Sequence, residues 1–163
     1  MVAASAGYRL YDGAQLGTGN LTLPQPAPNK GESAKIFRAT RYEDGGSFEL
    51  SRDGIYVLAF WSTLNKSTDR AQPELKELAH EYKAKGVSFV VVYVSNVPDG
   101  EENAPYTVLQ DSSGELTALY NIKRVPRLFL VDNGKIDLVQ NGYYWENDEQ
   151  LREELDQLLS NET

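Results

Sequence analysis

The chain has 163 residues, no cysteine, one histidine and a net charge of −8 at neutral pH. The lack of cysteine excludes disulfide scaffolds, thiolate catalysis and zinc–cysteine sites, and a lone histidine argues against a His-rich metal site or a Ser-His-Asp triad. The acidic balance, without a clustered basic face, argues against nucleic-acid binding. Length and a hydrophobic content of 40% fit one folded domain.

The beginning of the chain predicts an arm. Residues 1–33 are rich in Gly, Pro and Ala, and we expect them to be flexible or packed on the surface of a single domain over 34–163. We expect no full signal peptide at the start of this sequence, which has no basic segment followed by an apolar one. Ala4-Ser5-Ala6 resembles the small residues around a cleavage site, which would make Met1 the start of a mature exported chain. The alternative is that these are the small flexible residues common at any terminus.

The domain is expected to open with a β-hairpin, because two alternating segments, 35–42 and 47–50, flank Asp44-Gly45-Gly46. Residues 55–61 and 87–94 are continuous apolar runs that predict strands buried on both faces. Both runs are far too short to span a membrane, so we expect no membrane insertion.

Between those two strands the apolar residues follow the period of an amphipathic helix. Leu75, Leu78, Ala79 and Tyr82 stand at i, i+3, i+4 and i+7, and Gly86 is expected to end the helix. A strand, a helix and a second strand in this order predict a parallel pair with a right-handed crossover.

The second half of the chain predicts four further elements. Asn133-Gly134 is a strong signal for a two-residue hairpin turn between two alternating segments, and the C-terminal leucines have helical spacing. The elements are an extended piece at 106–111, a short helix at 113–122, a hairpin of 127–132 with 135–142, and a helix at 147–159.

This order of elements resembles the thioredoxin-like superfamily, and most of all the exported thiol–disulfide oxidoreductases of the TlpA/ResA type, which are redoxin and AhpC/TSA-related proteins. In that family an apolar strand ends in Phe-Trp-x-Thr-Trp-Cys-x-x-Cys, with a proline five residues later. Here the strand leads into Phe60-Trp61-Ser62-Thr63-Leu64-Asn65-Lys66-Ser67-Thr68, and Pro73 stands five residues after Thr68. The resemblance covers about residues 34–160.

A second group of residues matches the family farther along the chain. Val125-Pro126, Asn133-Gly134 and Gly142 correspond in type and spacing to the family's cis-proline, hairpin turn and following glycine. The resemblance implies a three-layer α/β/α thioredoxin-like sandwich with a central mixed sheet and an N-terminal β-hairpin extension. It also implies a cis peptide bond at Pro126.

The sequence departs from the family where the family performs its chemistry. Asn65 and Thr68 replace the two cysteines, and Leu64 replaces the preceding tryptophan. Disulfide exchange needs an attacking thiolate and a resolving thiol, and neither an amide nor a hydroxyl without a nearby base can substitute for them. We therefore expect no dithiol–disulfide or cysteine-peroxidase activity, and no catalytic residue.

Three interpretations of the loop Leu64, Asn65, Lys66, Ser67 and Thr68 remain open. It is a well-capped helix start, since Asn, Ser and Thr are good N-cap residues. Alternatively, its amides form an anion or carboxylate site, assisted by Lys66 and Arg127. The third interpretation is engineered removal of the cysteines, although engineers usually choose Ser or Ala.

The segment Val125-Pro126-Arg127 has two interpretations. Pro126 shapes the loop that faces the helix start, or its neighbours pair with an extended peptide by strand addition, as they do in the family. Together with Trp61, these residues are the candidate surface for peptide or anion binding. The exposed remainder of Tyr143-Tyr144-Trp145 is a further possible contact patch.

The predicted function is that of a redox-inactive binding or structural module with a degenerate active site. The alternative is a member by descent of the oxidoreductase family that keeps a cysteine-free activity or peptide binding in the same groove; a part in a larger assembly is a third hypothesis. We expect no cofactor and no metal, and a protein or peptide partner that the sequence does not name. The resemblance implies an exported, periplasmic or extracytoplasmic protein, with a cytoplasmic location left open.

Overall fold

The computed structural model describes residues 26–144 and 146–161. Most of the predicted arm and Trp145 therefore lie outside the described residues. The elements in chain order are β1 (Phe37–Thr40), β2 (Ser47–Leu50), β3 (Ile55–Trp61), α2 (Lys66–Lys83), β4 (Val87–Tyr93), the 3-10 helix η1 (Glu101–Asn103), β5 (Thr107–Gln110), α3 (Glu115–Leu119), β6 (Arg127–Asp132), β7 (Lys135–Asn141) and α4 (Glu146–Asn161).

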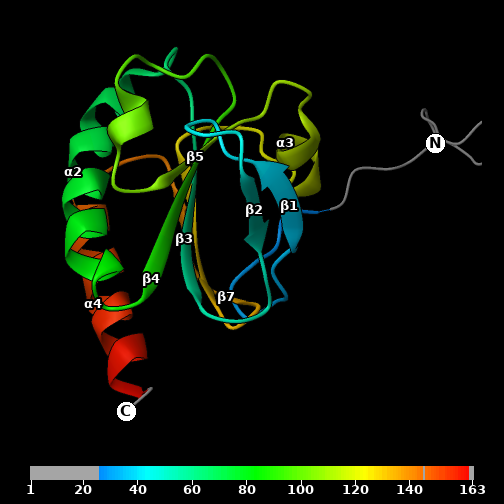
Figure 1. Cartoon of the computed structure of the whole chain (residues 1–163). Helices are drawn as coiled ribbons and strands as arrows, with labels where there is room; N and C mark the ends of the chain where they lie inside the picture. Colours follow the sequence, from blue (N-terminus) through cyan, green and yellow to red (C-terminus); the bar gives the residue numbers. More distant parts are fainter. Residues whose placement is uncertain (1–25, 145, 162–163) are drawn as a thin grey trace, which may run out of the picture.

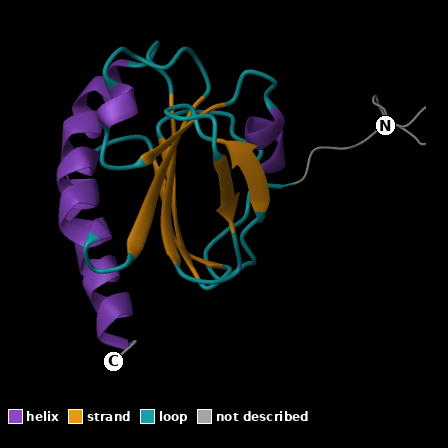
Figure 2. Ribbon diagram, in the orientation of Figure 1, coloured by secondary structure: helices purple, strands orange, loops and turns teal. Residues whose placement is uncertain are grey.

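These elements form the expected three-layer thioredoxin-like sandwich. The central sheet has the order β5-β4-β3-β6-β7, in which β3, β4 and β5 are parallel and β6 and β7 are antiparallel to their neighbours. Helices α2 and α4 cover one face, while α3 and the β1–β2 hairpin cover the other (Figures 1 and 2). The mixed sheet and the N-terminal hairpin are confirmed.

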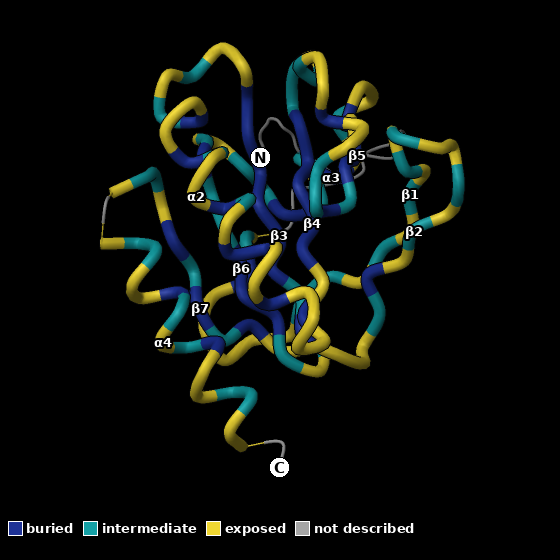
Figure 3. The backbone as a smooth tube through the Cα atoms, turned by 60° about the vertical axis from the view of Figure 1, so that its left-hand side comes forward, coloured by how far each residue is buried: buried dark blue, intermediate teal, exposed yellow. Residues whose placement is uncertain are grey.

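Strand β3 lies at the centre of the sheet, and its two faces contribute to separate cores. Val57, Ala59 and Trp61 pack on the side of α2 and α4, and Leu58 and Phe60 pack toward the hairpin and α3. Because successive side chains of a strand point to opposite faces, a strand between two layers must be apolar at nearly every position. The backbone tube in Figure 3 is accordingly buried through the central strands, and the exposed segments lie mainly in loops and on the outer sides of the helices.

Helix α2 has the predicted apolar face, with Leu75, Leu78 and Tyr82 buried. It ends at Lys83, three residues before Gly86, which adopts a φ of +93°. A glycine accepts this left-handed conformation without steric conflict. The chain can therefore turn directly into β4.

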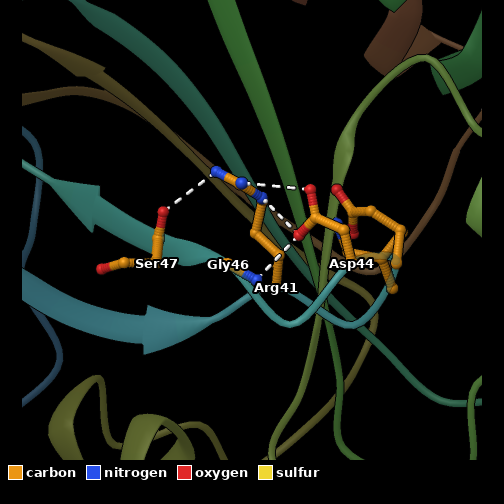
Figure 4. Close-up of polar contacts among 6 residues, drawn as sticks. Arg41, Asp44, Gly46 and Ser47 are labelled. Carbon is orange, nitrogen blue, oxygen red and sulfur yellow. Dashed lines mark hydrogen bonds and ion pairs between the residues drawn. The ribbon is translucent and has the colours of Figure 1, made fainter.

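An ion pair within the turn stabilises the β1–β2 hairpin. The Arg41 guanidinium donates to Asp44 and to the carbonyl oxygen of Ser47, and Asp44 also accepts from the amide of Gly46 (Figure 4). The amide of Tyr42 donates to Val108 of β5 at 2.8 Å. The hairpin turn therefore covers part of the sheet edge formed by β5.

The β6–β7 hairpin has the predicted turn. Asn133 and Gly134 both adopt positive φ, +47° and +85°, as the favoured two-residue turns require. The described end of the arm then runs beside β7, because the Gly31 amide donates to the Ile136 carbonyl and the Ile136 amide donates to the Glu32 carbonyl.

Candidate functional site

In the loop between β3 and α2, four successive backbone amides have hydrogen-bond partners within the loop or on Ser95. The Ser62 amide donates to the Thr68 hydroxyl, and the Thr63 amide to the Ser95 hydroxyl. The Leu64 amide donates to the Ser62 hydroxyl, and the Asn65 amide to the Ser62 carbonyl. Short polar side chains therefore hold a closed loop at the position where the resembled family carries its reactive thiols.

Asn65 caps helix α2 and also contacts the proline loop. Its Oδ1 accepts from the amide of Ser67 at 2.8 Å, which makes Asn65 the N-cap residue. Its Nδ2 donates to the carbonyl oxygen of Val125 at 2.7 Å. A cysteine sulfur is only a weak hydrogen-bonding group, so asparagine at this position exchanges a reactive group for a double structural contact.

Thr68, at the position of the second family cysteine, is 3% exposed. Its hydroxyl accepts from the Ser62 amide at 3.3 Å. Within the described parts of the chain, no histidine or carboxylate hydrogen-bonds to Thr68 or to the Asn65 side chain. Neither group therefore has a base that would make it a nucleophile.

The proline loop has the geometry that the resemblance implied. The Val125–Pro126 peptide bond is cis, and Pro126 is buried. Its carbonyl oxygen accepts from the amide of Gly142 at 2.8 Å. Gly142 adopts a φ of +76°, and a glycine permits this turn. The loop is therefore tied to α2 through Asn65 and to the end of β7 through Gly142.

Two hollows flank the proline loop. On one side a narrow cleft of about 30 Å³ lies between α2, the sheet and α4, with Trp61, Leu75 and Asp148 in its lining. On the other side lies a depression of about 460 Å³, which we call the proline basin. It is lined by Lys123, Arg124, Val125, Pro126, Arg127, Asn141, Gly142 and Tyr144. Pro126 and Arg127 line both hollows.

Arg127 combines a buried atom with a cationic group. Its Nε is buried and has no hydrogen-bond partner within the described structure, and its guanidinium lies 5.4 Å from the centre of the Phe129 ring. Burial lowers the pKa of Arg127. Removing a donor from water without an acceptor is unfavourable, and the Nε of Arg127 bears this cost in the folded protein.

The cleft contains a carboxyl group with an unusual pKa. Burial, and to a smaller extent Glu74, raises the pKa of Asp148 to about 6, against an opposing hydrogen bond from Tyr143. That bond runs from the Tyr143 hydroxyl to Oδ2 of Asp148 over 3.1 Å. Burial and Asp148 also raise the pKa of Tyr143 to about 12.

The candidate residues differ widely in exposure. Leu64 is 89% exposed and Lys66 is exposed, whereas Trp61 is 2% exposed and packs edge-on against Tyr93 and Tyr106. Trp61 can therefore contribute a wall of the cleft but little contact surface. The structure brings the 64–68 loop and the 125–127 segment together through the bond between Asn65 and Val125.

A buried carboxylate that no sequence pattern indicated lies near Trp61, because its partner Tyr106 packs against that ring. Glu101 is 2% exposed; it pairs with Lys76 at 2.9 Å and accepts from the hydroxyls of Tyr93 and Tyr106. These contacts fasten η1 to α2 and β4. Glu101 belongs to the acidic run Asp99-Gly100-Glu101-Glu102, in which no local pattern marks one carboxylate for burial.

No cluster of His, Asp and Glu suited to a metal ion occurs in residues 26–144 and 146–161. Within the same ranges, no helix is both long and apolar enough to cross a bilayer.

Comparison with known proteins gives a consistent family. The thiol-disulfide oxidoreductase ResA of Bacillus thuringiensis subsp. konkukian is 27% identical over 169 residues, which cover 98% of this chain and 89% of ResA. ResA of Geobacillus kaustophilus is 26% identical and covers 87% of this chain and 82% of its own length. The names of both relatives describe disulfide chemistry, for which this chain has no cysteine.

Solved structures agree with the fold. A candidate thiol:disulfide interchange protein DsbE from Chlorobium tepidum superimposes with a TM-score of 0.70 at 26% identity, over 82% of this chain and 99% of its own. StoA from Bacillus subtilis gives a TM-score of 0.60 at 22% identity, over 73% of this chain and 95% of its own. The sequence profile of the Redoxin family matches residues 29–157, which include every strand of the sheet and most of α4, and the chain therefore belongs to the Redoxin family.

Proposed function

We propose that this protein is a redox-inactive member of the Redoxin family that works as a binding module at the proline loop. The observation that carries the proposal is the side chain of Asn65, which caps α2 and holds the Val125 carbonyl. The loop is thus held in place without a thiol. Preorganised loops lose less conformational entropy when a partner binds.

The absence of cysteine carries the redox half of the proposal. Exchange requires a thiolate that attacks sulfur and a thiol that resolves the mixed disulfide. The Asn65 amide is not a nucleophile at neutral pH, and the Thr68 hydroxyl is buried and engaged with Ser62. The helix start is a poor anion site as well, because Asn65 already accepts from the Ser67 amide.

The binding half rests on the surface around Pro126. Leu64 precedes Asn65 and is 89% exposed, and Tyr144, on the rim of the proline basin, is 63% exposed. Exposed apolar side chains next to the two residues that hydrogen-bond to this loop, Asn65 and Gly142, favour a protein contact. The Val125 carbonyl keeps a second lone pair, so an extended segment has an acceptor for strand addition.

The first test separates redox activity from binding. The intact protein should show no insulin reduction and no thiol exchange, with ResA as the positive control; measurable turnover would contradict the redox half. For binding, an immobilised library of extended peptides should retain wild-type protein and lose it on Tyr144→Ser. Tyr42→Ser is the matched control, because Tyr42 is 46% exposed on the β1–β2 hairpin. Equal loss in both variants would contradict the binding half.

We also infer an extracytoplasmic location from the resemblance to exported oxidoreductases. Fractionation of native cells, followed by immunoblotting for this chain, tests the inference. Detection in the cytoplasmic fraction alone would contradict it.

A further inference from the structure

Three cationic side chains meet at the proline basin. Lys123 and Arg124 are exposed on one side of Pro126, and Arg127 follows it at the start of β6. No Asp or Glu is among the eight residues that line the basin. This is unexpected in a chain with 24 acidic and 16 basic residues.

Among the residues that the structure describes, these cations have no counter-ion within 4.0 Å. The ion pairs found in the described residues involve Arg38, Arg41, Lys76, Lys85 and Arg152, and none involves a cation of the basin. Arg127 also keeps a buried Nε without an acceptor. The basin therefore presents unpaired positive charge at the position where the proposed function places a partner.

We propose that the proline basin binds an acidic, extended segment of a partner protein; this proposal rests on the proposed function and specifies its ligand. Side chains two residues apart on a strand point to the same side, so carboxylates at alternate positions would face the cations together. Arginine is suited to such a ligand, since its guanidinium can hold a carboxylate through two parallel hydrogen bonds. Charge complementarity favours this occupant over a basic or neutral segment.

The surroundings of the basin restrict how the segment lies. Beyond Tyr144, the first turns of α4 present a separate acidic surface lined by Glu146, Glu149, Gln150 and Glu153. Like charges would repel an acidic segment there. The carboxylates of the partner are therefore directed toward Lys123 and Arg124. A second copy of this chain, which would bind through the same acidic surface of its own α4, is the alternative occupant of the proline basin.

The test uses the full chain and three fluorescein-labelled hexapeptides in which valine alternates with glutamate, glutamine or lysine. Fluorescence anisotropy should show the glutamate peptide binding about tenfold more tightly than the glutamine peptide, and lysine more weakly still. Raising the salt from about 50 mM to about 300 mM should remove most of that preference, since the charges are near the surface.

The double variant Lys123→Gln/Arg124→Gln should bind the glutamate peptide at least about fivefold more weakly. Its matched control is Lys83→Gln/Lys85→Gln, which lowers the net charge equally at the far end of α2 and should bind as wild type does. If both double variants weaken peptide binding equally, the net charge of the protein alone explains the effect, and the proposal is overturned.

Three further outcomes also decide the question. Equal affinity for the glutamate and glutamine peptides overturns the acidic ligand but leaves the binding module standing. Failure of all three peptides to bind overturns both proposals. Light scattering could also show a concentration-dependent dimer that the Lys123→Gln/Arg124→Gln substitutions dissociate. A second copy of this chain would then be the occupant, and the proposal of a separate partner protein would be overturned.

Discussion

The side-chain amide of Asn65 donates a 2.7 Å hydrogen bond to the carbonyl oxygen of Val125, 60 residues farther along the chain. Because Oδ1 of the same amide accepts from Ser67, both of its polar ends are engaged. An amide has one acceptor end and one donor end, so the two contacts fix its orientation. A single side chain thus couples the helix start to the cis-proline loop.

Asn65→Ala should destabilise the fold by about 2 kcal/mol, of which about 1 reflects the lost N-cap and about 1 the lost bond to Val125. Asn65→Ser should lose about half as much, because serine caps the helix but is too short to reach Val125. Urea unfolding measures both free energies. Asn96→Ala, at an exposed loop position, is the control and should change the free energy of unfolding little. If Asn65→Ala changes it no more than Asn96→Ala does, the coupling is contradicted.

The double variant Asn65→Cys/Thr68→Cys should acquire thiol–disulfide exchange. The first cysteine would lie at the N-terminus of α2, where the helix dipole lowers thiol pKa values. Insulin reduction with dithiothreitol detects the gain. Either single variant provides the control, because Asn65→Cys alone lacks the resolving thiol and Thr68→Cys alone lacks the attacking one. A folded double variant without exchange would show that this frame has lost more than its cysteines.

Asp148 should make stability depend on pH below neutrality. Its pKa is raised from 3.8 to about 6 in the folded state, so the folded protein binds the proton more tightly and stability falls as pH rises from about 4 to about 6. Asp148→Asn should flatten this part of the stability profile. Urea unfolding at several pH values measures it, with Asp99→Asn, an exposed loop carboxylate, as control; an unchanged profile would contradict the assignment.

Glu101→Gln should destabilise the fold by about 2 kcal/mol, since hydrogen bonds to a charged group contribute more than neutral ones and Lys76 loses its partner. Thermal unfolding followed by circular dichroism measures the change. Glu102→Gln is the matched control, because the neighbouring carboxylate is exposed. If both variants unfold alike, the buried network does not anchor η1.

Much of the fold followed from local patterns. The two buried strands, the face of α2 and the turn at Asn133-Gly134 could be predicted because each signal lies within a few residues. The burial of Glu101 could not, since its partners Tyr93 and Lys76 come from β4 and α2. Nothing in a run of acidic residues distinguishes the one that folds inward.

By itself, the sequence determined that this protein has no thiol chemistry, because it contains no cysteine and folding cannot supply one. Its resemblance to the family also predicts that Asn65 and Thr68 stand at the two cysteine positions. Only the tertiary structure decided what the replacements do: Thr68 satisfies the amide of Ser62, and Asn65 joins the helix start to Val125. Such roles depend on which groups the fold brings within hydrogen-bond distance, and separation along the chain does not report that distance.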